Sequence, residues 1–95
     1  MPYVLVRQKT RGQEKWRLAF DSQRARRREA GCRSELVLIN DQDPNDLFAL
    51  MEFEDAEALR KYVGGEHLQK ALAEARVISN EHYVLHAANS EPGDT

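Results

Sequence analysis

Residues 35–53 read ELVLINDQDPNDLFALMEF, two apolar runs separated by a short polar segment. The first run, residues 36–39, is continuously apolar, which is typical of a strand that is buried on both faces. The polar segment, residues 41–46, is dense in turn-forming residues. The second run alternates between two apolar strand faces, with Leu47, Ala49, Met51 and Phe53 on one face and Phe48 and Leu50 on the other. The stretch therefore predicts a β-hairpin whose strands are apolar on both faces.

One strand and one helix are predicted before this hairpin. Residues 3–9 are rich in β-branched and aromatic side chains and are too few for a stable helix, so they predict a strand. Residues 13–30 are good helix formers and carry an apolar stripe at helical spacing, formed by Trp16, Ala19 and Phe20. Thr10 and Gln13 have the spacing of a capping box, so we expect them to begin this helix.

A second helix and a fourth strand are predicted after the hairpin. Asp55 is a suitable N-cap for a helix with an apolar side, formed by Leu59, Tyr62 and Val63. Two glycines at positions 64 and 65 interrupt that helix, and helical spacing resumes over residues 68–75, so a bent or two-part helix is expected. Residues 77–80 lead into a strand over residues 81–87, and residues 88–95 are predicted to be a disordered tail.

The predicted order of elements, strand–helix–strand–strand–helix–strand, has a consequence for assembly. Two helices can cover only one face of a small open sheet, yet these strands are apolar on both faces. We therefore expect the uncovered face to pack against a second copy of the chain, and we predict a homodimer. Ninety-five residues allow one domain with a modest core, which we place at residues 1–87.

Charge and cysteine content narrow the possible partners and locations. Fourteen basic and 16 acidic residues give a formal net charge of −2, so we expect no binding to nucleic acid or to an anionic membrane surface. No stretch approaches the roughly 20 apolar residues that span a membrane. The single cysteine, Cys32, cannot form an intrachain disulfide, which favours a reducing, cytoplasmic location.

The histidines and the paired glutamates give weak signals of chemistry. His82 and His86 lie in a predicted strand, where four residues span about 13 Å, so they cannot share one ion and no metal site is predicted. Glu52 and Glu54 share one strand face about 6.7 Å apart, and paired carboxylates can divide acid and base roles. Ordinary alternation at the end of a strand gives the same pattern and is the favoured explanation.

A run of arginines, Arg24 and residues 26–28, occupies the end of the first predicted helix. Positive charge near a helix C-terminus is favoured by the backbone dipole, so a solvated helix face explains most of the run. Arg27 differs because it continues the inward stripe of Trp16, Phe20 and Gln23. An inward guanidinium needs an anionic partner or a ligand, so Arg27 is a candidate pocket residue.

The second half of the chain carries a family resemblance. Residues 52–59 read EFEDAEAL and are followed by Tyr62 and by GEHL at residues 65–68. This pattern resembles the antibiotic-biosynthesis-monooxygenase-like family of dimeric α/β barrels, which typically shows Glu-x-Trp-x-Asp, an Ala-Leu pair, a histidine and a Ser-x-His-Phe/Leu segment. Glu52 and His67 match it, whereas Phe53 replaces the common tryptophan and Tyr62 stands where a histidine is usual. The likeness spans most of residues 3–86.

The resemblance implies an α+β, ferredoxin-like βαββαβ subunit with a four-stranded antiparallel sheet and helices on one face. In this family the sheet pairs with its twin to form a dimeric α/β barrel. Its members include cofactor-independent monooxygenases of quinol-like or polyketide aromatics, so the resemblance implies no cofactor. The asparagine–tryptophan–histidine set of the haem-degrading members is not recognisable, which argues against that activity.

Two functions follow from these observations. In the first, the protein oxidises a small aromatic or quinol-like substrate in a dry pocket, with His67 as base and Arg27 as stabiliser of the substrate anion. The residues expected to contact that substrate are Trp16, Gln23, Glu52, Phe53 and Tyr62. In the second, a non-catalytic dimer binds a small hydrophobic ligand or is a structural module, and the aromatic residues are core. A cavity between the first helix and the sheet favours the enzyme, whereas a filled interior favours the alternative.

Overall fold

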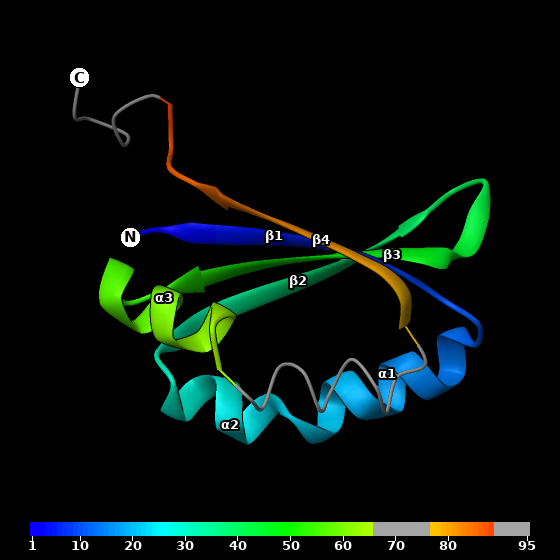
Figure 1. The fold of residues 1–95 in the computed structure, drawn as a ribbon, viewed down its shortest axis with the longest axis horizontal. Coiled ribbons are helices and arrows are strands. Elements are labelled where there is room, and N and C mark those ends of the chain that lie inside the picture. Colours follow the sequence, from blue (N-terminus) through cyan, green and yellow to red (C-terminus); the bar gives the residue numbers. More distant parts are fainter. Residues whose placement is uncertain (66–76, 89–95) are drawn as a thin grey trace.

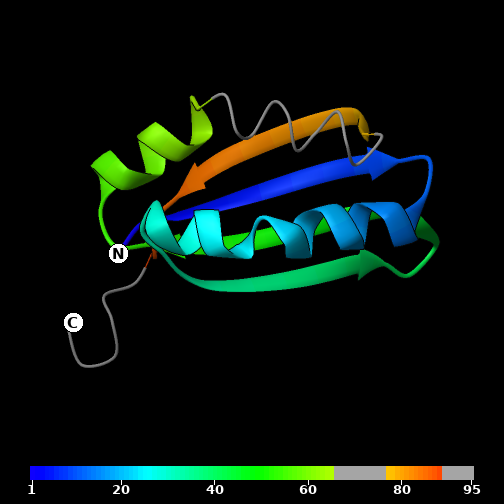
Figure 2. The same ribbon diagram turned by 90° about the horizontal axis from the view of Figure 1, so that it is seen from below.

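A four-stranded sheet carries the described helices on one of its faces in the computed structural model, which describes residues 1–65 and 77–88 (Figure 1). The elements in chain order are β1 (Tyr3–Thr10), α1 (Gln13–Ser22), α2 (Arg24–Glu29), β2 (Cys32–Asn40), β3 (Asp43–Phe53), α3 (Ala56–Val63) and β4 (Val77–Leu85). The α1–α2 pair runs along the length of the sheet, and α3 lies at one end on the side of β1 and β4 (Figure 2).

The strand order across the sheet is β2-β3-β1-β4, and every neighbouring pair is antiparallel. The predicted α+β, ferredoxin-like arrangement with helices on one face is therefore confirmed. The β2–β3 hairpin is tighter than expected, because β3 begins at Asp43 rather than after the predicted turn. Local side-chain bonds hold this connection: the Gln42 amide donates to Asn40 Oδ1 (2.9 Å) and the Asn45 amide to Asp43 Oδ1 (3.0 Å).

The first helix differs from its prediction at both its start and its middle. Gly12 is the N-cap, without a side-chain cap bond, so the predicted capping box of Thr10 and Gln13 is wrong. The Gln13 amide donates instead to Asn45 Oδ1 at 3.1 Å. The expected single helix over residues 13–30 is divided at Gln23, whose amide donates to the Phe20 carbonyl (3.2 Å) in a tightened turn.

The core lies between the sheet and the helices. The larger cluster of buried side chains contains Val4, Val6, Cys32, Ala49, Met51, Phe53 and Leu59. A second cluster is built on Trp16 and Leu47, with Phe20 packed against it. The wholly apolar face predicted for β3, with Leu47, Ala49, Met51 and Phe53, is the one that packs inward, and all four residues are buried. Burial of this apolar surface is the main force that holds the helices on the sheet.

Gly31 brings the end of α2 close to the beginning of α3. Its φ of 104° lies in the left-handed region that favours glycine. An added Cβ would lie 2.9 Å from the Ala58 Cβ and 3.0 Å from Glu54 Oε1, so the approach also requires the absence of a side chain. The Glu54 amide donates to the Gly31 carbonyl at 2.9 Å and fixes this junction.

The opposite side of the sheet, which we call the open sheet face, is apolar. Strand register places these side chains together on it: Tyr3, Leu5, Leu36, Leu38, Phe48, Leu50, Tyr83 and Leu85. Leu36 is 54% exposed, Leu38 47% and Tyr83 49%. None of the described helices covers this face (Figure 1). Apolar side chains therefore lie on both faces of β2 and β3, as predicted, whereas the middle of β4 is polar.

Three further predictions concern the C-terminal half. The fourth strand begins at Val77, earlier than the predicted residue 81. The second part of the predicted helix, residues 68–75, and residues 89–95 of the predicted tail lie outside the described residues. Over residues 1–65 and 77–88, no helix is long and apolar enough to cross a membrane.

Candidate active site

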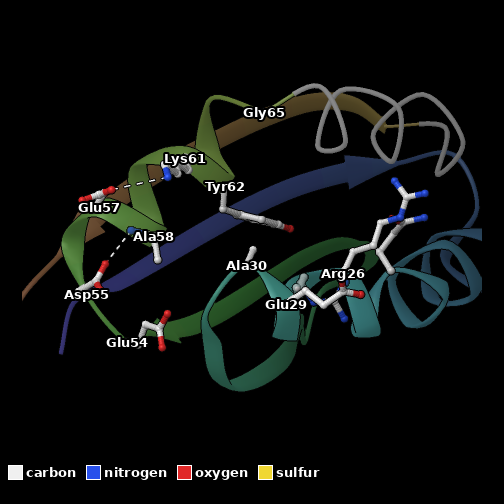
Figure 3. Close-up of a pocket in the computed structure, with 12 residues that line it drawn as sticks. Arg26, Glu29, Ala30, Glu54, Asp55, Glu57, Ala58, Lys61, Tyr62 and Gly65 are labelled. Carbon is white, nitrogen blue, oxygen red and sulfur yellow. Dashed lines mark hydrogen bonds and ion pairs between the residues drawn. The ribbon is translucent and has the colours of Figure 1, made fainter.

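A pocket of about 440 Å³ lies between α2 and α3 (Figure 3). This volume is within the range of roughly 300–1,000 Å³ that is typical of small-molecule sites. Its described lining comes from α2, from the segment that follows β3 and from α3: Gln23, Arg26, Arg27, Glu29, Ala30, Glu54, Asp55, Glu57, Ala58, Lys61, Tyr62 and Gly65. The Gly31 junction lies beside this lining, since Gly31 closely approaches Ala58 and Glu54.

Tyr62 reaches from α3 across the pocket, above Ala30 and toward the side of Arg26 (Figure 3). Its ring packs on Phe53 with centroids 5.2 Å apart, and this contact limits its motion. Burial raises the pKa of the Tyr62 hydroxyl, and the nearby Arg27 partly opposes that rise. The hydroxyl is therefore neutral near pH 7 and can donate a hydrogen bond into the pocket.

Arg27 is almost completely buried, with 1% of its surface exposed, and its charge is compensated. Its Nε and Nη2 donate to Glu35 Oε2 (2.6 Å) and Oε1 (3.0 Å), and Nη1 donates to the Phe20 carbonyl (2.7 Å). The guanidinium also lies over the Phe20 ring, 3.7 Å from its centroid. Burial opposes ionisation of Glu35, but the hydrogen bonds and charges of Arg27 and Arg24 together outweigh it and lower the Glu35 pKa. The pair is thus ionised and held by hydrogen bonds.

Most of the charged groups at the rim are also paired. Lys61 Nζ lies 3.6 Å from Glu57 Oε1, and Arg33 Nη2 lies 2.8 Å from Glu54 Oε2. The Asp55 carboxylate accepts the Ala58 amide at 2.7 Å as the N-cap of α3. Three of the described lining residues are basic and four are acidic, so the described wall does not form a cationic site for acidic ligands.

The predicted substrate contacts fall in different places. Gln23, Arg27 and Tyr62 line the pocket together. Trp16 does not, because it is buried under α1, stacked on Phe20 (4.8 Å between centroids) and bonded through Nε1 to Gln8 Oε1 (2.6 Å).

The remaining predicted residues also lie away from the pocket lining or beyond the described part. Phe53 is fully buried in the core beneath Tyr62. Glu52 lies on the open sheet face, where it accepts a hydrogen bond from the Ser34 hydroxyl (3.3 Å). His67 lies outside the described residues. Of the predicted site residues that the structure describes, only Gln23, Arg27 and Tyr62 therefore lie together at the pocket.

The space beneath α1 is filled, and the pocket lies elsewhere. Trp16, Phe20 and Leu47 fill the space between α1 and the sheet, where a cavity would have favoured the enzyme and a filled interior favours the non-catalytic alternative. Sequence reasoning also missed Ala30 and Ala58, which leave room for the pocket. Alanine is a common helix former, so its presence in a helix does not indicate a pocket. That these two alanines face each other follows from the close contact at Gly31, which local sequence does not show.

No metal centre is formed within residues 1–65 and 77–88, where no group of three or more His, Cys, Asp or Glu side chains is placed to hold an ion. Cys32 is buried, and its thiol donates to the Ser34 carbonyl at 3.4 Å. Burial raises the pKa of this thiol, so it is neither a ready nucleophile nor a ready metal ligand.

Comparison with known proteins supports the fold. SnoaB from Streptomyces nogalater, described as a cofactor-independent oxygenase, is 16% identical with a TM-score of 0.79, and the match covers 96% of each chain. A Mycobacterium tuberculosis protein is 16% identical with a TM-score of 0.70, covering 97% of this chain and 100% of that one. A candidate antibiotic biosynthesis monooxygenase from Deinococcus radiodurans is 15% identical with a TM-score of 0.72, covering 97% of each. No curated protein matches.

At such identities the structural likeness concerns the fold alone, whereas the family follows from the sequence. The family model described as antibiotic biosynthesis monooxygenase matches residues 5–74, well over half of the chain. The resemblance inferred from residues 52–68 is therefore confirmed, and the chain belongs to the antibiotic biosynthesis monooxygenase family.

Proposed function

We propose that this protein is a homodimeric, cofactor-independent oxygenase of small phenol-like or quinol-like aromatics. The observation that carries the proposal is the pocket between α2 and α3, with the Tyr62 hydroxyl on its wall. Family membership and the fold shared with SnoaB support this class of chemistry. The proposal extends to this chain an activity that is described for a protein of the same fold.

The proposed reaction converts a phenol and O₂ into a quinone and water. One oxygen atom forms a bond to a ring carbon, which loses its hydrogen, and the other oxygen atom leaves as water. The substrate supplies all the electrons, so the protein must deprotonate the phenol, hold the anion and exclude water. This requirement suits a partly enclosed pocket with neutral hydrogen-bond donors.

Several lining residues suit these tasks. The Tyr62 ring, Ala30 and Ala58 offer surface to a flat aromatic ring, and the Tyr62 hydroxyl and the Gln23 amide offer polar contacts. His67 remains our candidate for the base. Arg27 remains a candidate stabiliser of the anion, although its pairing with Glu35 reduces the charge that it can present to a ligand.

The dimer belongs to the same proposal. The open sheet face exposes large apolar side chains on neighbouring strands, and the described helices lie on the other face. Contiguous apolar surface of this kind is a common mark of an interaction site. We propose that a second copy of the chain covers it, so that two sheets pack face to face.

The test is oxygen uptake by the purified protein with a panel of naphthols and hydroquinones, in the presence of a metal chelator and without added flavin. We expect quinone formation coupled to oxygen consumption, no product under argon, and at least roughly tenfold slower turnover in Tyr62→Phe. An absence of oxygen uptake above the rate of the uncatalysed reaction, across the panel, would sink the enzymatic proposal.

The second candidate function is non-catalytic binding of a small aromatic ligand. The bidentate pairing of Arg27 with Glu35 favours it, because this buried cation is then not free to stabilise a substrate anion. Binding of the same phenols without oxygen consumption would support this alternative over the oxygenase.

A further inference from the structure

We infer that Tyr62 is the residue that hydrogen-bonds the phenolic oxygen of the ligand, while Arg27, which lines the same pocket and is held by Glu35, acts on this hydroxyl through its charge without touching the ligand. The inference rests on the proposed use of the pocket as a phenol site. It assigns Arg27 a different role from that of a direct anion stabiliser and adds Glu35, which is not a lining residue.

The contacts of Arg27 support the positioning role. Every nitrogen of its guanidinium is engaged, Nε and Nη2 with Glu35 and Nη1 with the Phe20 carbonyl. One face of the guanidinium is covered by the Phe20 ring. These contacts join α1, α2 and β2, so moving Arg27 toward a ligand would break bonds to two elements. Such a group is fixed in place rather than available.

Tyr62 has the opposite character. Its ring is supported by Phe53 from below, yet its hydroxyl extends across the pocket (Figure 3). Because the ring is held by packing, the hydroxyl oxygen keeps one position and only its hydrogen needs to turn toward a ligand. A hydroxyl held in this way loses little entropy when it donates to a bound phenol.

The surroundings of Tyr62 set its proton affinity. Burial raises the pKa of its hydroxyl, the charge of Arg27 on α2 lowers it, and Cys32 and Glu35 on β2 raise it. Together these effects leave the Tyr62 side chain neutral, next to the buried cation of Arg27. A neutral donor of this kind binds a phenolate more strongly than a phenol, which favours loss of the ligand's proton.

The first experiment measures binding of 4-nitrophenol by difference absorbance, which also distinguishes the bound phenol from the bound phenolate. We expect Tyr62→Phe to bind the phenolate about tenfold more weakly than the wild type. The control is Ser22→Ala, which removes an exposed hydroxyl that does not line the pocket and should leave binding unchanged.

The second experiment tests the positioning role through the titration of Tyr62, obtained as the difference between tyrosine absorbance titrations with and without Tyr62→Phe. Loss of the nearby cation in Arg27→Met should raise the pKa of Tyr62, whereas loss of the nearby anion in Glu35→Gln should lower it. Arg27→Lys keeps the positive charge and should disturb folding less than Arg27→Met. The fluorescence of Trp16 reports whether each variant is folded.

The outcomes separate the inference from the proposed function. A fall in the pKa of Tyr62 in both pair variants, toward its ordinary value, would mean that the pair only keeps the pocket closed, and it would overturn the inference. No change in either variant would also overturn it. Equal binding by wild type and Tyr62→Phe would remove the ligand contact but leave the pocket as a phenol site. Absence of 4-nitrophenol binding to the wild type would instead count against the proposed function itself.

Discussion

At the scale of single residues, Asp46 shows how a buried carboxylate joins three strands. It is 1% exposed on β3 and accepts bonds from Arg7 Nε (3.0 Å) and Nη2 (2.9 Å) on β1 and from Asn40 Nδ2 (2.9 Å) on β2. The hydrogen bond from Arg7, followed by that from Asn40, lowers the pKa of Asp46 from 3.8 to about 2. The charged form is therefore the one that the folded state prefers.

This pKa predicts how stability depends on acid. Because the folded-state pKa is below the unfolded value of 3.8, ionised Asp46 stabilises the fold above about pH 4, and the contribution is lost as the pH falls toward 2. Asp46→Asn should lower the urea midpoint at pH 7, and its difference from the wild type should shrink between pH 4 and pH 2. Glu81→Gln is the control, because it removes another carboxylate near Arg7 (3.9 Å), but one that is exposed rather than buried. A difference in urea midpoint between Asp46→Asn and the wild type that stays constant with pH would contradict this account.

Residue patterns predicted the faces of the strands well and the partners of polar groups poorly. Side-chain alternation has a period of two, so the grouping of alternate residues from Leu47 to Phe53 on one face followed directly from the sequence. The sequence also indicated that an inward Arg27 needs an anion. It could not identify Glu35, because that choice depends on how the end of α2 meets β2. Contacts between elements are not encoded in local spacing.

At the scale of elements, the same limit appears in the helices. The capping box failed because the cap of α1 comes from Asn45, far along the chain in the hairpin. The division at Gln23 was not predictable from helix propensity, since residues on both sides are good helix formers. The division frees the Phe20 carbonyl from its usual helical partner, and Arg27 Nη1 takes this acceptor at 2.7 Å. A break in one helix thus provides part of the site for the buried arginine.

The cap of α3 is the element-scale feature that was predicted from sequence, and it bears on the pocket. Asp55 accepts the Ala58 amide at 2.7 Å, so Asp55→Ala should destabilise the protein by about 1 kcal/mol in urea unfolding. Because α3 forms one wall of the pocket, we also expect weaker binding of 4-nitrophenol. Asp55→Ser keeps an oxygen acceptor and should recover most of the loss. Equal stability of the two variants would show that the cap bond contributes nothing.

At the scale of the whole molecule, the order of elements predicted the topology, but not the position of the pocket. A strand–helix–strand–strand–helix–strand chain has few ways to pair its strands, and the β2-β3-β1-β4 order is the ferredoxin-like one. Whether the space beneath the first helix is hollow or filled was left open, and in the structure Trp16 stacks on Phe20 and fills it. Whether two aromatic rings leave a cavity depends on their packing angle, which a sequence does not contain.

The proposed dimer is the remaining whole-molecule prediction, and a single charge should disrupt it. Leu36 is 54% exposed on the open sheet face of the edge strand β2 and pairs in register with Leu50 on the neighbouring strand β3. In a two-fold dimer, Leu36→Glu replaces two apolar side chains of the interface by two like charges, which costs on the order of several kcal/mol. Light scattering at micromolar concentration should then change from the mass of two chains to that of one.

The matched control for this prediction is Leu18→Glu, on the helical side of the molecule. Leu18 is 71% exposed on α1, so the substitution adds the same charge to a leucine that is even more accessible, but away from the open sheet face. It should leave the dimer intact. If both variants dissociate, the effect is one of net charge rather than of a buried face. If the wild type already has the mass of one 10.9 kDa chain, the apolar strands have no second copy to cover them, and the proposed assembly is wrong.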